Sequence, residues 1–141
     1  MTVTDLLLPV FVEVALTFVL LFWMAALRTR ALRSGAVQPG DVSLRQQRWP
    51  ERATQVANCF HNQLEQPMLF YVVVAFILIT STNSLIFVLL AWIFVLARLV
   101  HAYIHTGRND VWQRGTVMGV GAVALVLMWV IFAIRILITG A

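Results

Sequence analysis

Three long apolar runs constrain the fold of this chain more than any other feature. They cover residues 6–27, 85–104 and 116–138, and each contains at most one Asp, Glu or Arg. A helix rises about 1.5 Å per residue, so about 20 residues cross the roughly 30 Å apolar core of a bilayer. Only 11% of the 141 residues are charged, whereas soluble domains carry about 25%. The sequence therefore predicts an integral membrane protein with a single domain, residues 1–141.

A fourth span is less obvious. Residues 68–79 are continuously apolar but too short to cross, so the helix must recruit the polar segment before them and begin near Pro50, a typical first-turn proline. Backbone polar groups need internal partners in lipid, which favours helices. We therefore expect an all-α membrane protein, a four-transmembrane-helix up-down bundle. The expected helices cover residues 5–28, 51–81, 84–106 and 114–139.

The arginines orient these spans. The first connection carries Arg28, Arg30, Arg33, Arg45, Arg48 and Arg52, and the third carries Arg108 and Arg114. The second connection and the N-terminal segment carry none, so the positive-inside rule places both termini away from the cytoplasm. The first span lacks the basic start of a cleaved signal peptide. The arginines sit in clusters between apolar spans, so we do not expect nucleic acid as a partner.

Polar residues gather on one side of the second expected helix. At about 100° per residue, four of them fall within an arc of roughly 100°. These are Asn58, His61, Asn62 and Glu65. Pro67 follows and should free a backbone carbonyl one turn earlier, near Gln63. Polar and ionisable residues within spans usually face the bundle interior, so this side is a candidate site.

The third expected helix repeats the pattern with Arg98, His101 and His105. Both clusters lie in the same half of the membrane, so we expect them to face one another around a polar pocket. Arg98 and Arg114 would be available there to bind an anionic group. A purely structural interpretation is also open, in which Glu65 pairs with Arg98 and the amides join neighbouring helices.

A metal site is a sharper alternative. His61 and Glu65 lie one helical turn apart, and so do His101 and His105. Three histidines and one carboxylate would suit zinc or iron. Each helix offers only two ligands, and the preferred interpretation includes no metal.

Other residues have structural interpretations. Glu13 and Arg135 are expected to neutralise each other, and the single cysteine, Cys59, is expected to fill space between helices. Small residues allow close helix packing, and tryptophans anchor spans at the membrane surface. The corresponding residues are Gly115, Gly119 and Gly121 for packing, and Trp23, Trp49 and Trp112 for anchoring.

Two segments resemble a known family. They are Asn62-x-x-Glu65-x-Pro67-x-Leu-Phe on the second helix and Arg98-x-x-His101-x-x-Ile-His105 on the third. With four short spans and a basic first connection, they resemble the MAPEG superfamily, membrane-associated proteins in eicosanoid and glutathione metabolism. The pattern looks most like a bacterial branch, which implies a bacterial inner-membrane location.

The resemblance implies a homotrimer whose active sites lie between protomers and use glutathione as co-substrate. Arg114, near the start of the fourth helix, would be catalytic by stabilising the glutathione thiolate. The implied glutathione-binding residues are Arg28, Arg30, Asn58, Asn62, Glu65, Arg98, His101 and His105.

The chain departs from glutathione-using members at three positions. Asn58 stands where they carry an arginine, and His101 and His105 stand where they carry tyrosines. The expected function is a glutathione-dependent transferase or peroxidase acting on lipophilic electrophiles dissolved in the surrounding lipid. The alternative is a non-catalytic membrane scaffold or accessory subunit of a larger membrane complex.

Overall fold

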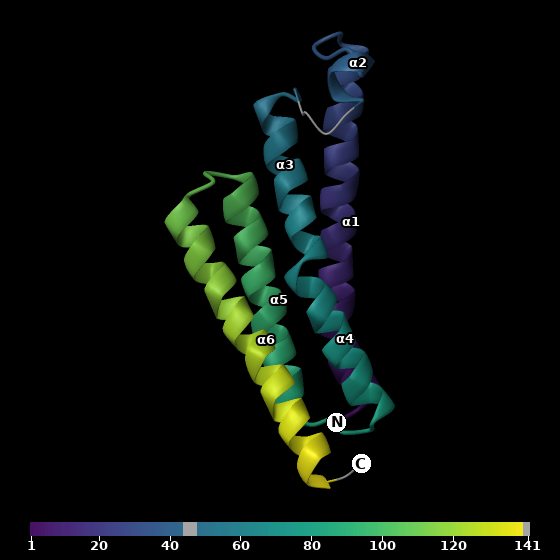
Figure 1. Cartoon of the computed structure of the whole chain (residues 1–141), viewed down its shortest axis with the longest axis vertical. Coiled ribbons are helices and arrows are strands. Elements are labelled where there is room, and N and C mark those ends of the chain that lie inside the picture. Colours follow the sequence, from purple (N-terminus) through teal and green to yellow (C-terminus); the bar gives the residue numbers. More distant parts are fainter. Residues whose placement is uncertain (44–47, 140–141) are drawn as a thin grey trace.

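The computed structural model describes residues 1–43 and 48–139, and within them every regular element is helical (Figure 1). The elements are α1 (Val3–Arg33), α2 (Pro39–Val42), α3 (Glu51–His61), the 3-10 turn η1 (Asn62–Leu64), α4 (Gln66–Ile79), α5 (Leu85–Thr106) and α6 (Val111–Thr139). Together α3, η1 and α4 form one discontinuous span, so the four expected membrane-spanning helices are confirmed. Arg45 lies outside the described residues.

Local capping explains why two helices are longer than expected. α1 starts with a capping box between Thr2 and Asp5 and ends at Arg33, and Gly35, with φ of 71°, follows the C-cap residue Ser34. Its 31 residues span about 46 Å, more than the roughly 30 Å apolar core, so its last turns lie beyond that core. α6 starts three residues before the expected position because the Asp110 carboxylate accepts from the Gln113 amide at 2.8 Å.

The helices form a bundle in which α5 contacts α1, α3 and α6, while α4 packs on α6. Both termini lie at one end, together with the turn that joins α4 and α5 (Figure 1). We call the opposite end the basic end. It carries Arg28, Arg30, Arg33, Arg48, Arg52, Arg108 and Arg114. Towards this end α6 diverges from α3 (Figure 1).

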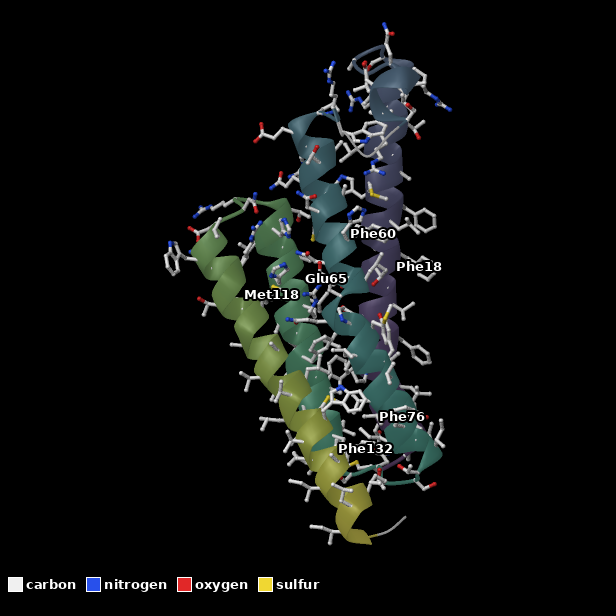
Figure 2. The ribbon with its side chains drawn as sticks, viewed as in Figure 1. Phe18, Phe60, Glu65, Phe76, Met118 and Phe132 are labelled. Atoms are coloured by element: carbon white, nitrogen blue, oxygen red, sulfur yellow. The ribbon has the colours of Figure 1, made fainter. Side chains whose placement is uncertain are left out.

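The larger hydrophobic core lies in the half of the bundle nearer the termini. Phe70 and Phe94 stack there with ring centroids 4.6 Å apart. Phe76 of α4 stacks on Phe132 of α6 at 6.1 Å (Figure 2). Closer to the basic end the core is thinner, and Cys59 is fully buried there as a small packing residue.

The discontinuity between α3 and α4 follows from Pro67, which lacks the amide hydrogen that would bond to the carbonyl of Gln63. The chain passes through η1, and Glu65 leaves helical geometry with φ and ψ both near −97°. The interruption expected from Pro67 is confirmed.

Only one glycine of the small-residue pattern packs closely within the protomer. A Cβ added at Gly121 would lie 3.4 Å from the Ala97 Cβ, whereas nothing lies within 4 Å at Gly115 or Gly119. Close approach of α6 to α5 therefore depends on Gly121.

We expect Gly121→Leu to destabilise the protein by about 1–3 kcal/mol, because the added side chain must enter a filled helix contact. Unfolding of the purified protein in mixed detergent micelles would measure the loss. Gly119→Leu is the matched control, since its side chain would enter open space. Equal losses in the two variants would contradict the assignment of Gly121 as the contact residue.

Candidate functional site

A buried polar cluster joins α1, η1 and α5. Arg98 is 1% exposed and Glu13 is fully buried, and Arg98 Nε lies 3.7 Å from Glu13 Oε1. Arg98 Nη2 donates to the Asn62 carbonyl at 2.9 Å. The Gln63 amide is oriented by its hydrogen bonds, so that Nε2 donates to Glu13 at 2.7 Å and Oε1 accepts from Arg98 at 3.1 Å. Arg98 thus holds the backbone in place where the second span is interrupted, and Glu13 neutralises the positive charge of Arg98.

This cluster replaces two ion pairs considered from the sequence. Glu13 pairs with Arg98 rather than with Arg135, whose Nη1 donates to the Thr82 carbonyl at 2.9 Å. The structural alternative for Arg98 named Glu65, which is exposed at the break between η1 and α4. The distance of each residue from the end of the bundle that holds the termini explains why Glu13 pairs with Arg98 and not with Arg135. At about 1.5 Å per residue, Glu13 and Arg98 lie about 15 and 20 Å along their helices from the same end, whereas Arg135 lies only about 6 Å from it.

The expected polar sides of the second and third spans meet at one point. Asn62 Nδ2 lies 3.5 Å from His105 Nδ1, and the His101 and His105 rings pack edge to face with centroids 5.5 Å apart. His101 Nδ1 lies 3.1 Å from the Arg114 carbonyl oxygen, which ties the start of α6 to α5. Arg114 donates from Nη1 to Asn109 Oδ1 at 2.5 Å. Asn62 and the start of α6 therefore both contact histidines in the last two turns of α5.

Other candidate residues lie outside this meeting point. Arg28 lies over the Trp49 ring at 5.1 Å, and Arg30 is exposed on α1. Asn58, His61 and Glu65 are exposed along α3 and the break that follows it. In the described part of the chain, no three His, Cys, Asp or Glu side chains come together as a metal site, so the four-ligand alternative is not assembled.

A polar pocket of about 510 Å³ lies at the basic end, between α3 and the turn that joins α5 to α6. Its lining residues are Glu51, Thr54, Gln55, Asn58, Gly107, Arg108 and Asn109. Gln55 closes the inner side, because its Nε2 donates to the carbonyls of His105 at 2.7 Å and Gly107 at 3.1 Å. Sequence reasoning singled out Asn58 but missed Glu51 and Gln55. The helical period could have found both, because they share the side of α3 that carries Asn58.

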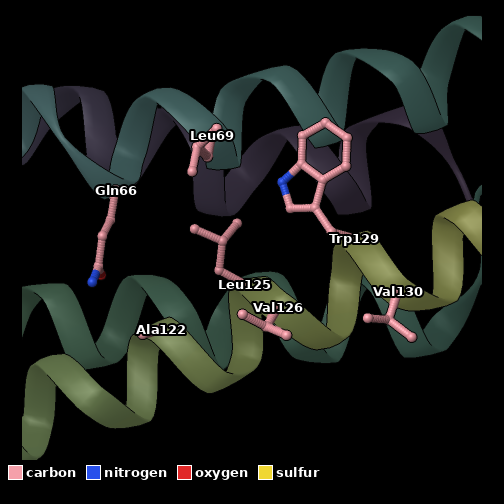
Figure 3. A pocket seen from close by; sticks show the side chains of 7 residues that line it. All are labelled: Gln66, Leu69, Ala122, Leu125, Val126, Trp129 and Val130. Carbon is pink, nitrogen blue, oxygen red and sulfur yellow. The ribbon is translucent and has the colours of Figure 1, made fainter.

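An apolar groove of about 570 Å³ lies farther along the bundle, between α4 and α6. Its lining residues are Gln66, Leu69, Ala122, Leu125, Val126, Trp129 and Val130 (Figure 3). Gln66 extends from the start of α4 towards α6 and is the only polar lining residue among those described. It directly follows Glu65, so the groove begins where the polar side of α3 ends. A molecule with a polar and an apolar part could be accommodated along this side of the bundle.

The comparisons with known proteins give one finding. A family model described as MAPEG family matches residues 6–134. No curated protein and no solved structure matches the chain. The matched range begins in α1, ends in α6 and includes the buried cluster, the polar pocket and the apolar groove. Because this match spans nearly the whole sequence, the chain belongs to the MAPEG family.

Proposed function

We propose that the protein is a membrane-embedded glutathione-dependent transferase or peroxidase acting on lipophilic electrophiles. One observation carries the proposal: Asn62 and His105 meet between η1 and α5, and an apolar groove begins at Gln66, four residues after Asn62. A water-soluble thiol and a lipid-soluble electrophile need such adjoining polar and apolar surfaces. Membership of a family named for glutathione metabolism supports the same assignment.

In the proposed reaction, Arg114 stabilises the glutathione thiolate by placing a positive charge beside it. The thiolate sulfur attacks the electrophilic carbon, an S–C bond forms, and the leaving group departs with the electron pair of its bond. With a hydroperoxide, the sulfur attacks the O–O bond and releases an alcohol, and a second thiol then gives a disulfide and water. Binding both reactants side by side supplies proximity, and the arginine supplies ionisation.

The remaining candidates take binding or positioning roles in this proposal. Asn58, Asn62 and Glu65 would contact glutathione along the polar side of α3. His101 and His105 are only 1% and 4% exposed, so they would act by holding the start of α6 and the Asn62 side chain in place. Arg98 is buried against Glu13, so it would act by holding the Asn62 segment in place.

Two further candidates lie on α1. α1, which carries Arg28 and Arg30, lies on the opposite side of the bundle from α6 (Figure 1). They would reach the site only if it is shared between protomers of a homotrimer. The basic end would face the cytoplasm of a bacterial inner membrane, with both termini on the other side.

Calorimetry with the detergent-purified protein tests the proposal. We expect saturable binding of glutathione that weakens about tenfold in Asn62→Ala and in His105→Ala, because the first variant removes a polar contact and the second removes the buried side chain beside Asn62. Arg33→Ala removes an exposed charge from the end of α1 and should bind as the wild type does. Absence of saturable binding at millimolar glutathione would rule out the proposed reaction.

A second candidate is a non-catalytic scaffold or accessory subunit of a larger membrane complex. The burial of Arg98 favours it, since the most central arginine is committed to joining three segments. An experimental structure of the purified protein, with the molecules bound to it, distinguishes the two candidates. A tripeptide-shaped anion beside Arg114 would favour the enzyme, whereas lipid chains alone at that position would favour the scaffold.

A further inference from the structure

A hollow of about 570 Å³ lies on the outer side of α1 at the basic end, apart from the polar pocket. Its lining residues are Ala25, Ala26, Thr29, Arg30, Arg33 and Ser34, and all six are exposed. Leu20, Met24 and Ala31, on the other side of the same helix, are buried in the bundle. The hollow therefore opens away from the other helices.

Exposed aromatic side chains continue this hollow towards the middle of the membrane. Phe18 and Phe22 are 52% and 67% exposed, and their ring centroids lie 6.2 Å apart. Phe18 points away from the bundle (Figure 2). At about 100° per residue, an arc of roughly 60° contains both aromatic residues together with Thr29 and Arg33. One side of α1 thus carries an aromatic surface, then two small alanines, and then the arginines.

The two arginines of the hollow lie at the depth of lipid headgroups. The apolar run of α1 ends at Leu27, and Arg30 and Arg33 follow it by about 5 and 9 Å along the helix axis. The headgroup layer adds roughly 5–8 Å on each side of the apolar core. Side chains of a helix tilt towards its N-terminus, so both arginine side chains are directed back towards the membrane.

No protein group neutralises these two arginines within the described part of the chain. Neither the Arg30 nor the Arg33 guanidinium has an ion pair or a hydrogen bond there, whereas the exposed Arg48 pairs with Asp41. The hollow therefore complements a molecule that is anionic at headgroup depth and apolar below it.

We propose that this hollow binds one phospholipid with an anionic headgroup, of which phosphatidylglycerol is the simplest representative. Arg30 and Arg33 contact the lipid phosphate through charge-assisted hydrogen bonds, which guanidinium groups form well with phosphate. One acyl chain lies over the two alanines and against Phe22. A free phosphate ion would leave this apolar part of the surface uncovered. The lipid site goes beyond the proposed function, because α1 lies on the opposite side of the bundle from α6 (Figure 1).

Native mass spectrometry of the protein in a neutral detergent, titrated with defined lipids, tests the proposal. We expect the double variant Arg30→Gln with Arg33→Gln to bind phosphatidylglycerol about 10- to 30-fold more weakly, because each arginine near the membrane surface favours an anionic lipid about fivefold. Phosphatidylcholine with the same chains should bind the wild type more weakly, since its ammonium group opposes the arginines. Arg48→Gln with Arg108→Gln removes the same charge from the same end of the bundle and should leave phosphatidylglycerol binding unchanged.

Ala26→Phe tests the apolar part of the site, because it fills the space over the alanines and keeps every charge. Its side chain is exposed, so the fold should survive. We expect the variant to lose affinity for phosphatidylglycerol. If Ala26→Phe instead leaves lipid binding intact and dissociates an oligomer, the hollow is a contact between copies of the chain and the proposal is wrong.

The remaining outcomes also decide the matter. An equal loss of phosphatidylglycerol in both double variants would show that only the total charge matters, and displacement of the lipid by inorganic phosphate would reduce the site to an anion site. Either result would overturn the proposal. We expect millimolar glutathione to leave lipid binding unchanged. Displacement of the lipid by glutathione would assign Arg30 to the thiol instead, which supports the proposed function and rejects the lipid site.

Discussion

Replacing either Glu13 or Arg98 by leucine is expected to destabilise the protein by about 3–5 kcal/mol, because each single change leaves one buried charge without its partner. Both side chains are at most 1% exposed, and they lie at a depth where lipid, not water, surrounds the bundle. Arg98→Leu also removes the hydrogen bond to the Asn62 carbonyl at the helix interruption. Equilibrium unfolding in mixed detergent micelles would measure the loss.

The double variant Glu13→Leu with Arg98→Leu provides the internal control. It removes both charges together, so its loss should be smaller than the sum of the single losses. Arg33→Leu deletes an exposed charge from the end of α1 and should change stability little. Additive losses in the double variant would show that the two side chains do not form an energetic pair.

Arg114→Ala is expected to lower turnover with glutathione by about 10²–10³-fold, the usual effect of removing one group that stabilises a reacting anion. The fold should survive, because the Arg114 backbone carbonyl, not its side chain, contacts His101. Steady-state rates with a lipophilic electrophile would measure the effect. The variant should regain activity as the pH rises, because a thiol that no cation stabilises ionises near its ordinary pKa of about 8.5.

Asn109→Gly complements this experiment, since glycine keeps the left-handed conformation of the turn and removes the group that holds the guanidinium. We expect a smaller fall in turnover and little change in stability. A pH profile of Arg114→Ala parallel to that of the wild type would show that Arg114 does not assist thiol ionisation.

The spans and the interruption could be predicted from the sequence because each depends on local rules. Hydropathy over about 20 residues defines a span, and Pro67 removes one hydrogen bond wherever its helix lies. The ion-pair partner of Glu13 could not be predicted from local rules, because it depends on which helices pack against α1. α1 packs on α5, and counting residues from the common membrane surface would have favoured Arg98 over Arg135. The glycine pattern was informative only at Gly121, because sequence spacing does not say which side of α6 meets α5.

The candidate site was predictable in part. The polar sides of α3 and α5 were expected to meet, and they do so at Asn62 and His105. The polar pocket was missed because one wall is the turn at Gly107–Asn109, whose shape depends on the left-handed Asn109 and on the contacts of Gln55. Such a wall has no periodic signal. Its position follows from how the end of α5 packs against α3.

The interruption after α3 also bears on how the chain enters the membrane. Segment 51–79 is the least apolar of the four spans, and its break exposes backbone groups that lipid cannot satisfy. Arg98 supplies a partner for the Asn62 carbonyl, but α5 is synthesised later than this segment. We therefore expect stable insertion of segment 51–79 to require α5. On this argument the second and third spans should enter the bilayer as a pair, after α1, which provides Glu13 as the partner of Arg98.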